Sequence, residues 1–74
     1  MHELIIPVES AIDTEITKLW VKRDTTSWTA FVKSLDKNII KVEFKLNNSI
    51  KDSTTVVKFK SPESKLMFIL KYST

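Results

Sequence analysis

Cysteine is absent from this chain, and histidine occurs once, at His2. Without cysteine there is no disulfide and no cysteine nucleophile, and a single histidine excludes a Cys/His zinc cluster. A Ser–His–acid triad would have to use His2 in a fraying terminal segment, where catalytic geometry is hard to hold. These absences predict a protein that is not an enzyme and that binds no cofactor.

Glycine is also missing, although folded domains average about 7% of it. Phosphate-binding loops, dinucleotide fingerprints and nucleophile elbows all need glycine, so these classes of site are excluded. Left-handed turn positions must then fall to other residues, of which Asn and Asp tolerate them best. We expect such turns at residues 24–26, 36–38, 47–48 and 52–53.

Long apolar runs are lacking as well. The longest apolar stretch is Leu66 to Leu70, which is far shorter than the roughly 18 residues that span a bilayer. The first residues have neither the basic start nor the apolar stretch of a signal peptide. We therefore expect a cytoplasmic protein with no membrane partner, which also fits the absence of cysteine.

Size and charge describe what is present. The 74 residues predict a single domain, 1–74, with 12 basic and 9 acidic residues and a net charge of +3. Arg23 is the only arginine, so the basic surface consists of lysines, which act as solvated point charges. This composition, rich in Lys, Asn, Ser and Thr, is typical of small phage or mobile-element accessory proteins.

A helix is predicted over residues 10–22. Ser10 can cap its start, and acidic residues precede basic ones along it, as the helix dipole favours. Its apolar face comprises Ile12, Ile16, Leu19 and Trp20. The alternative is a strand from residue 16 to residue 23.

Three segments rich in β-branched and aromatic residues follow, at 27–35, 38–46 and 54–60. In the second, Ile40, Val42, Phe44 and Leu46 alternate with charged residues and are expected in the core. The first also fits a helical spacing, but its composition favours a strand. If residues 3–8 form a strand, Pro7 makes it an edge strand.

The last segment, 61–72, is predicted to be a helix, with Ser61 as its N-cap, Pro62 in first position and Glu63 in its first turn. The alternative is a hairpin turn at Pro62 leading into a strand. The fold class is therefore α+β, a three-stranded antiparallel meander flanked by an N-terminal and a C-terminal helix. The alternative fold is a small all-β barrel of five to six strands.

On that last helix we expect Leu66, Ile69 and Leu70 to face the core. Phe68 and Tyr72 would then be exposed near Lys65 and Met67. Exposed apolar side chains on a small domain indicate a contact surface. The leading prediction is a non-enzymatic binding module that modulates or inhibits a larger protein through a surface of four residues. These partner-binding residues are Phe68, Tyr72, Lys65 and Met67. A homodimer is another way to cover such a surface.

The alternative function is RNA or DNA binding through lysines on the solvent face of the sheet. These lysines are Lys41, Lys45, Lys58 and Lys60. The predicted order of helix, three strands and helix is similar to that of double-stranded-RNA-binding domains, in topology only, and that resemblance implies recognition of duplex shape and phosphates. The family's glycine-containing loop and the lysine cluster that opens its last helix are missing here.

Three acidic residues, Glu9, Asp13 and Glu15, are the one cluster that a magnesium ion could use. Acidic residues are common at the start of a helix, where they interact favourably with the helix dipole. This second interpretation is favoured, so no metal site is predicted.

Overall fold

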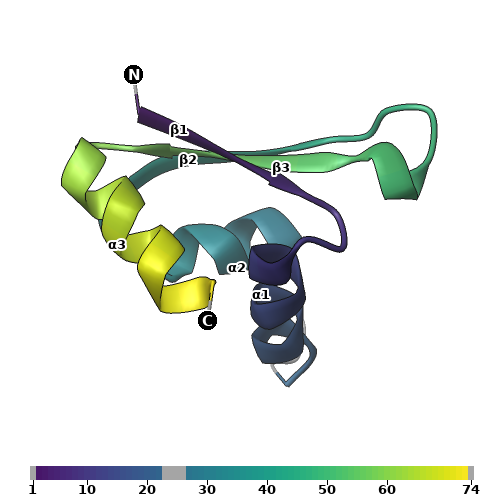
Figure 1. The fold of residues 1–74 in the computed structure, drawn as a ribbon, viewed down its shortest axis with the longest axis horizontal. Coiled ribbons are helices and arrows are strands. Elements are labelled where there is room, and N and C mark those ends of the chain that lie inside the picture. The colour runs from purple at the N-terminus through teal and green to yellow at the C-terminus, as the bar shows by residue number, and fades with distance from the viewer. Residues whose placement is uncertain (1, 23–26, 74) are drawn as a thin grey trace.

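The computed structural model describes residues 2–22 and 27–73, which form a three-stranded sheet and a layer of helices. The elements in chain order are β1 (His2–Pro7), α1 (Ala11–Val21), α2 (Trp28–Ser34), β2 (Ile39–Lys45), the short 3-10 helix η1 (Ile50–Asp52), β3 (Thr54–Phe59) and α3 (Pro62–Tyr72). All three α-helices lie on the same face of the sheet (Figure 1). The predicted α+β class is confirmed.

The sheet has the order β1-β3-β2, with β3 in the middle and antiparallel to both neighbours. It is therefore not a strict meander, because the first strand in the chain adds beside the last one. β1 is an edge strand, as the proline at its end predicts, and Pro7 pairs with Thr54.

Residues 27–35, expected to be a strand, instead form α2. The buried and half-buried apolar side chains of this segment follow a helical spacing: Trp28, Phe31, Val32 and Leu35. Ser27 caps the helix, since its Oγ accepts a hydrogen bond from the Ala30 amide at 3.3 Å. Helical periodicity thus outweighs the β-propensity of the composition, because it puts four apolar side chains against the sheet at once. The resemblance in topology to double-stranded-RNA-binding domains is lost with this strand.

α2 is joined to the sheet by a side-chain hydrogen bond. The indole Nε1 of Trp28 donates to Oγ1 of Thr55 over 2.9 Å, and Thr55 is fully buried in the middle strand. Trp28 also meets the edge of Trp20 of α1, with ring centroids 5.3 Å apart. These contacts tie two helices and the sheet together, so both tryptophans serve packing, as aromatic residues in small domains usually do.

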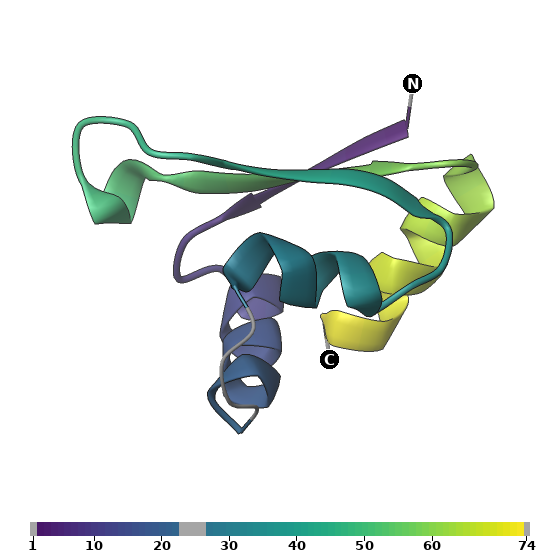
Figure 2. The ribbon, with the colours of Figure 1, turned by 180° about the vertical axis from the view of Figure 1, so that it is seen from behind.

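A bulge in β2 changes which of its residues are buried. Ile39 pairs with Phe59 and Lys41 with Lys58, so Ile40 is the extra residue. Ile39 is consequently buried, whereas Ile40, expected in the core, is 52% exposed. The expectation is also wrong for Phe44 and Leu46, which are exposed, while Val42 packs against the core. The hairpin joining β2 to β3 extends past the helices, which leaves that end of the sheet uncovered (Figure 2).

The core lies between the sheet and the helices, and every strand and α-helix contributes to it. Its buried side chains are Ile6, Ile16, Phe31, Val32, Ile39, Val57, Phe59, Phe68 and Tyr72. A chain of this length buries only about 60–65% of its unfolded surface, so each of these side chains supports a large share of the stability.

Glu9, between β1 and α1, has a φ of 71° and is the only positive-φ position among residues 2–22 and 27–73. The expectation that Asn or Asp adopts a positive φ at 36–38, 47–48 and 52–53 is wrong. The expected turn at 24–26 lies outside the described residues. The start of α1 explains the exception. The Glu9 amide donates to Oδ2 of Asp13 at 3.0 Å, while Ser10 Oγ accepts from the Asp13 amide at 3.3 Å.

Both predicted helix starts are confirmed. α1 begins after Ser10, and α3 begins at Pro62 with Ser61 as its N-cap. Ser61 Oγ accepts a hydrogen bond from the Ser64 amide at 3.2 Å. The hairpin alternative for this segment is therefore wrong.

Ser61→Ala is expected to lower the free energy of unfolding by about 0.5–2 kcal/mol, because the Ser64 amide loses its acceptor. Pro62→Ala is the matched control and should be nearly neutral, since an amide in first position has no helical partner anyway. Urea unfolding followed by circular dichroism measures both. The reverse ranking would contradict the observed cap.

Candidate protein-binding surface

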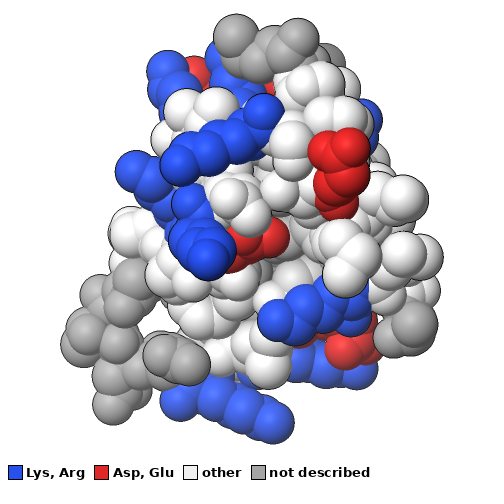
Figure 3. All heavy atoms as spheres, turned by 90° about the vertical axis from the view of Figure 1, so that its left-hand side faces the viewer, with Lys and Arg blue, Asp and Glu red and all other residues white. Residues whose placement is uncertain are grey.

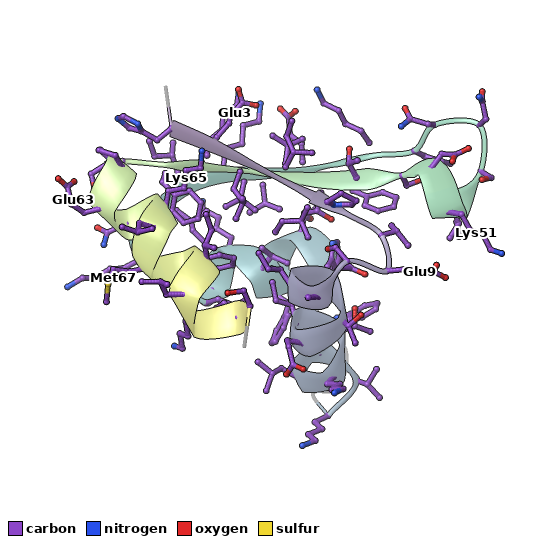
Figure 4. The ribbon with its side chains drawn as sticks, viewed as in Figure 1. Glu3, Glu9, Lys51, Glu63, Lys65 and Met67 are labelled. Atoms are coloured by element: carbon purple, nitrogen blue, oxygen red, sulfur yellow. The ribbon has the colours of Figure 1, made fainter. Side chains whose placement is uncertain are left out.

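α3 has one buried and one exposed side, and the exposed side carries three large apolar residues. Leu66, Met67 and Leu70 are 56%, 65% and 57% exposed. Met67 is directed outward from the helix, away from the rest of the molecule (Figure 4). Large apolar side chains are ordinarily the first to be buried, so three together on an eleven-residue helix mark a surface that needs explaining.

The prediction that Phe68 and Tyr72 are exposed is wrong. Phe68 is 2% and Tyr72 6% exposed. The Phe68 ring meets Phe59 edge-on at 5.3 Å between centroids and lies 4.7 Å from the Tyr72 ring. Two aromatic rings bury more apolar area than two leucines and gain additional energy from their edge contacts, so α3 turns this side to the sheet.

The sequence contained a signal for this orientation. Residues at i, i+3, i+4 and i+7 form one helical face, and Lys65, Phe68, Ile69 and Tyr72 have that spacing. All four are buried or half-buried. The charge of Lys65 hides the pattern, because a lysine can cover apolar surface with its stem while its ammonium group reaches water. Of the four predicted partner-binding residues, only Met67 is fully on the exposed side.

We call Leu66, Met67 and Leu70, together with Glu63 and Lys71 at the two ends, the α3 surface. All five residues are exposed. Successive residues of an α-helix are rotated by about 100° around its axis, which places Glu63 and Lys71 about 40° to either side of Met67 around the helix. Figure 3 views the molecule from the side on which α3 lies, and uncharged atoms there form a continuous area between lysine and acidic side chains.

A groove of about 450 Å³ runs beside the α3 surface, between α3 and the end of α2. It is lined by Leu35, Asp36, Met67, Phe68, Leu70, Lys71 and Tyr72. Met67 and Leu70 thus belong both to the exposed ridge of the helix and to the groove. A ridge next to a mostly apolar groove is the shape that receives another protein element by ridge-into-groove packing.

The predicted lysines lie on the other side of the molecule. Alternation along the strands puts Lys41, Lys45 and Lys58 on the open face of the sheet, opposite the helices. Lys60 follows the end of β3, and its amide donates to the Asn38 carbonyl at 3.0 Å. The prediction of a solvent-facing position is therefore confirmed for Lys41, Lys45 and Lys58.

Acidic residues share this open face. Lys41 Nζ lies 2.7 Å from Oε1 of Glu43, and Glu3 is paired with Lys58 across the strands. The hydrogen bond and charge of Lys41 lower the pKa of Glu43, and the charges of Lys58 and Lys45 add to the effect. Among the paired strand residues of this face, none is aromatic, so it offers no stacking platform for bases.

The Glu43 carboxyl is expected to titrate below its ordinary range, and Lys41→Gln should move its pKa back upward. Because the folded-state pKa is lowered, the contribution of this pair to stability is present at neutral pH. It is lost as the pH falls through that pKa. NMR pH titration of the Glu43 side chain measures the shift, with Lys51→Gln in the distant hairpin as a control. An unchanged pKa in Lys41→Gln would contradict the ion pair.

The acidic cluster at the start of α1 has structural partners. Asp13 accepts from the Glu9 amide, and Glu15 lies 3.3 Å from the ammonium group of Lys18. Nowhere in the part of the chain that the structure describes do three His, Cys, Asp or Glu residues come together as metal ligands would. The Asp13 carboxylate therefore helps to cap the helix start, and Glu15 forms an ion pair within α1.

The fold and surface define a small α+β domain with an exposed apolar area on one helix. None of its helices, within residues 2–22 and 27–73, is long and apolar enough to cross a membrane. Comparison with protein-family models, with curated proteins and with solved structures gives no match.

Proposed function

We propose that this chain is a non-enzymatic binding module that modulates or inhibits a larger protein by direct contact, through the α3 surface. The observation that carries the proposal is the exposure of Leu66, Met67 and Leu70, each more than half accessible, beside an apolar groove. Protein interfaces combine an apolar centre enriched in methionine with a charged rim, and Glu63 and Lys71 supply such a rim. The absence of cysteine fits a cytoplasmic setting.

The arrangement of the core supports the same proposal. The large aromatic side chains of α3 supply its contribution to the core, and Leu66, Met67 and Leu70 lie outside that cluster. Keeping them on the surface risks aggregation, and a polar replacement would leave the fold intact. Their presence is explained when another protein covers them.

An affinity experiment tests this function. The wild-type chain is immobilised and exposed to a cell extract, in parallel with Met67→Glu and with Ile5→Glu. Ile5 is 61% exposed on the open face of the sheet, so the control adds the same charge at a distant exposed site. A protein retained by the wild type and by Ile5→Glu, but not by Met67→Glu, supports the proposal. Retention by all three, or by none, contradicts it.

Nucleic-acid binding is the second candidate, because Lys41, Lys45 and Lys58 meet on one open face. The neighbouring Glu43 and Glu3 reduce the positive potential there, which is why it comes second. Each phosphate contact would steepen the dependence of log K on log salt by roughly 0.9 for a duplex. Binding of duplex RNA or DNA at about 50 mM salt, weakened by changing the three lysines to Gln, would favour it over the protein partner.

A further inference from the structure

We infer that the α3 surface pairs with a second copy of this chain, with the two α3 helices antiparallel and Met67 at the two-fold axis. This inference goes beyond the proposed function, since it adds another copy of the chain as a second occupant of the same surface. The observation behind it is the order of the exposed residues along the helix, which is acidic, apolar and basic.

The charges are placed symmetrically about Met67. Glu63 is four residues before it and Lys71 four residues after it, so the two charges are about 12 Å apart along the axis. Both are exposed on the same side as Met67. A two-fold axis at Met67 that reverses the helix brings Glu63 of one copy opposite Lys71 of the other, and it does so twice.

The same operation gathers the apolar residues. Leu66 and Leu70 lie on one side of Met67 around the helix, and the two-fold axis places both leucines of the second copy on that side too. The result is a short apolar seam with an ion pair at each end. A parallel pair would instead set Glu63 against Glu63 and Lys71 against Lys71, and this repulsion selects the antiparallel arrangement.

The pairing has a consequence for the larger protein partner. Self-pairing and binding of the larger protein use the same residues and exclude each other. At high concentration, a second copy of the chain therefore competes with the larger protein for this surface. The contact surface of two eleven-residue helices is at the small end of protein interfaces. The dimer should therefore be weak. The average molecular mass in solution should rise from monomer toward dimer as the protein concentration increases from about 10 µM to 1 mM.

Charge reversal tests the arrangement by sedimentation equilibrium on the purified chain. Glu63→Lys and Lys71→Glu should each weaken dimerisation by about tenfold or more, because each creates two like-charge contacts. An equal mixture of the two variants should associate as strongly as the wild type, since the mixed pair again has opposite charges at both ends. The double variant should do the same. Met67→Glu should be monomeric.

Circular dichroism melting checks that each variant is folded, because Glu63 also lies in the first turn of α3, where a lysine opposes the helix dipole. If Glu63→Lys unfolds, Glu63→Gln and Lys71→Gln replace the pair; each should weaken association, and Lys71→Gln should do so less than Lys71→Glu. A wild type that stays monomeric to 1 mM overturns the inference, and so does a mixture no more associated than its two components.

The failure of this inference differs from the failure of the proposed function. A monomeric wild type that still retains a protein through Met67 contradicts the self-pair and leaves the function standing. A dimer that follows the charge rules but retains no protein supports the self-pair and contradicts the function.

Discussion

Phe68→Ala is expected to lower the free energy of unfolding by about 3–5 kcal/mol, which is enough to unfold much of a domain of this size. Phe68 is 2% exposed, and its ring touches both Phe59 of the middle strand and Tyr72 one turn further along α3. Truncation leaves a cavity at the point where α3 meets the sheet. Neighbouring backbone cannot close such a cavity without losing its own packing.

Leu70→Ala is the matched control, because Leu70 is on the same helix and 57% exposed. Its cost should be within about 0.5 kcal/mol, as for other surface positions. Urea unfolding of both variants, with Phe68→Leu as a milder core substitution, gives the ranking. Equal costs for Phe68→Ala and Leu70→Ala would contradict the observed orientation of α3 and remove the α3 surface with it.

Ile16→Ala is expected to cost about 2–5 kcal/mol. Ile16 is fully buried, and it is the one residue of α1 that is buried outright. Ile12 and Trp20 only flank the core on either side of it. Removing the Ile16 side chain should loosen α1 from the sheet and from α2. The near-ultraviolet circular dichroism that arises from the Trp20–Trp28 edge contact should then decrease as well.

Leu19→Ala is the control for α1. The sequence places Leu19 on the same apolar face as Ile16, yet its side chain is 41% exposed. Its replacement should cost less than about 1 kcal/mol and leave the tryptophan signal intact. A Leu19→Ala variant as unstable as Ile16→Ala would mean that α1 packs with a different side toward the core.

Local signals predicted two of the three capped helices, α1 and α3. Ser10 and Ser61 each precede a helix by one residue, and their side chains accept the hydrogen bonds that such caps require. Pro7 predicted an edge strand because proline has no backbone N–H to donate to a neighbouring strand, which is also a local property. In each case a single residue imposes a physical constraint on the backbone, and that constraint acts in any fold.

Orientation and register were harder to predict, because they depend on residues far apart in the chain. Nothing within β2 shows that Ile40 is the bulged residue; the pairing of Ile39 with Phe59 decides it. Likewise α2 is a helix because Trp28 reaches Thr55 and Phe31 reaches the core, and both partners lie elsewhere in the sequence. Such tertiary contacts override the β-propensity of the segment.

The candidate surface shows the same limit. The sequence indicated correctly that α3 has more apolar residues than one side can bury, but it placed the aromatic residues outside. The choice between Phe68 and Leu70 rests on the shape of the space beneath the sheet, where the Phe59 ring receives Phe68 edge-on. Met67 is exposed in the structure, so its expected exposure does not depend on that choice.

A single cysteine tests most directly whether the α3 surface pairs with a second copy of the chain. The chain has no other thiol, so Met67→Cys introduces one at the centre of the surface. Helices packed with axes about 8–10 Å apart place facing Cα atoms about 3.5–5.5 Å from each other, which overlaps the range that a disulfide bridges. Ile5→Cys, exposed on the open face of the sheet, reports random collision.

Under mild oxidation at equal concentration, Met67→Cys should form a disulfide-linked dimer at least about tenfold faster than Ile5→Cys, because pre-association raises the effective concentration of the second thiol. Adding Glu63→Lys to Met67→Cys should slow the reaction. Equal rates for Met67→Cys and Ile5→Cys, read on a non-reducing gel, would contradict a self-pair at this surface.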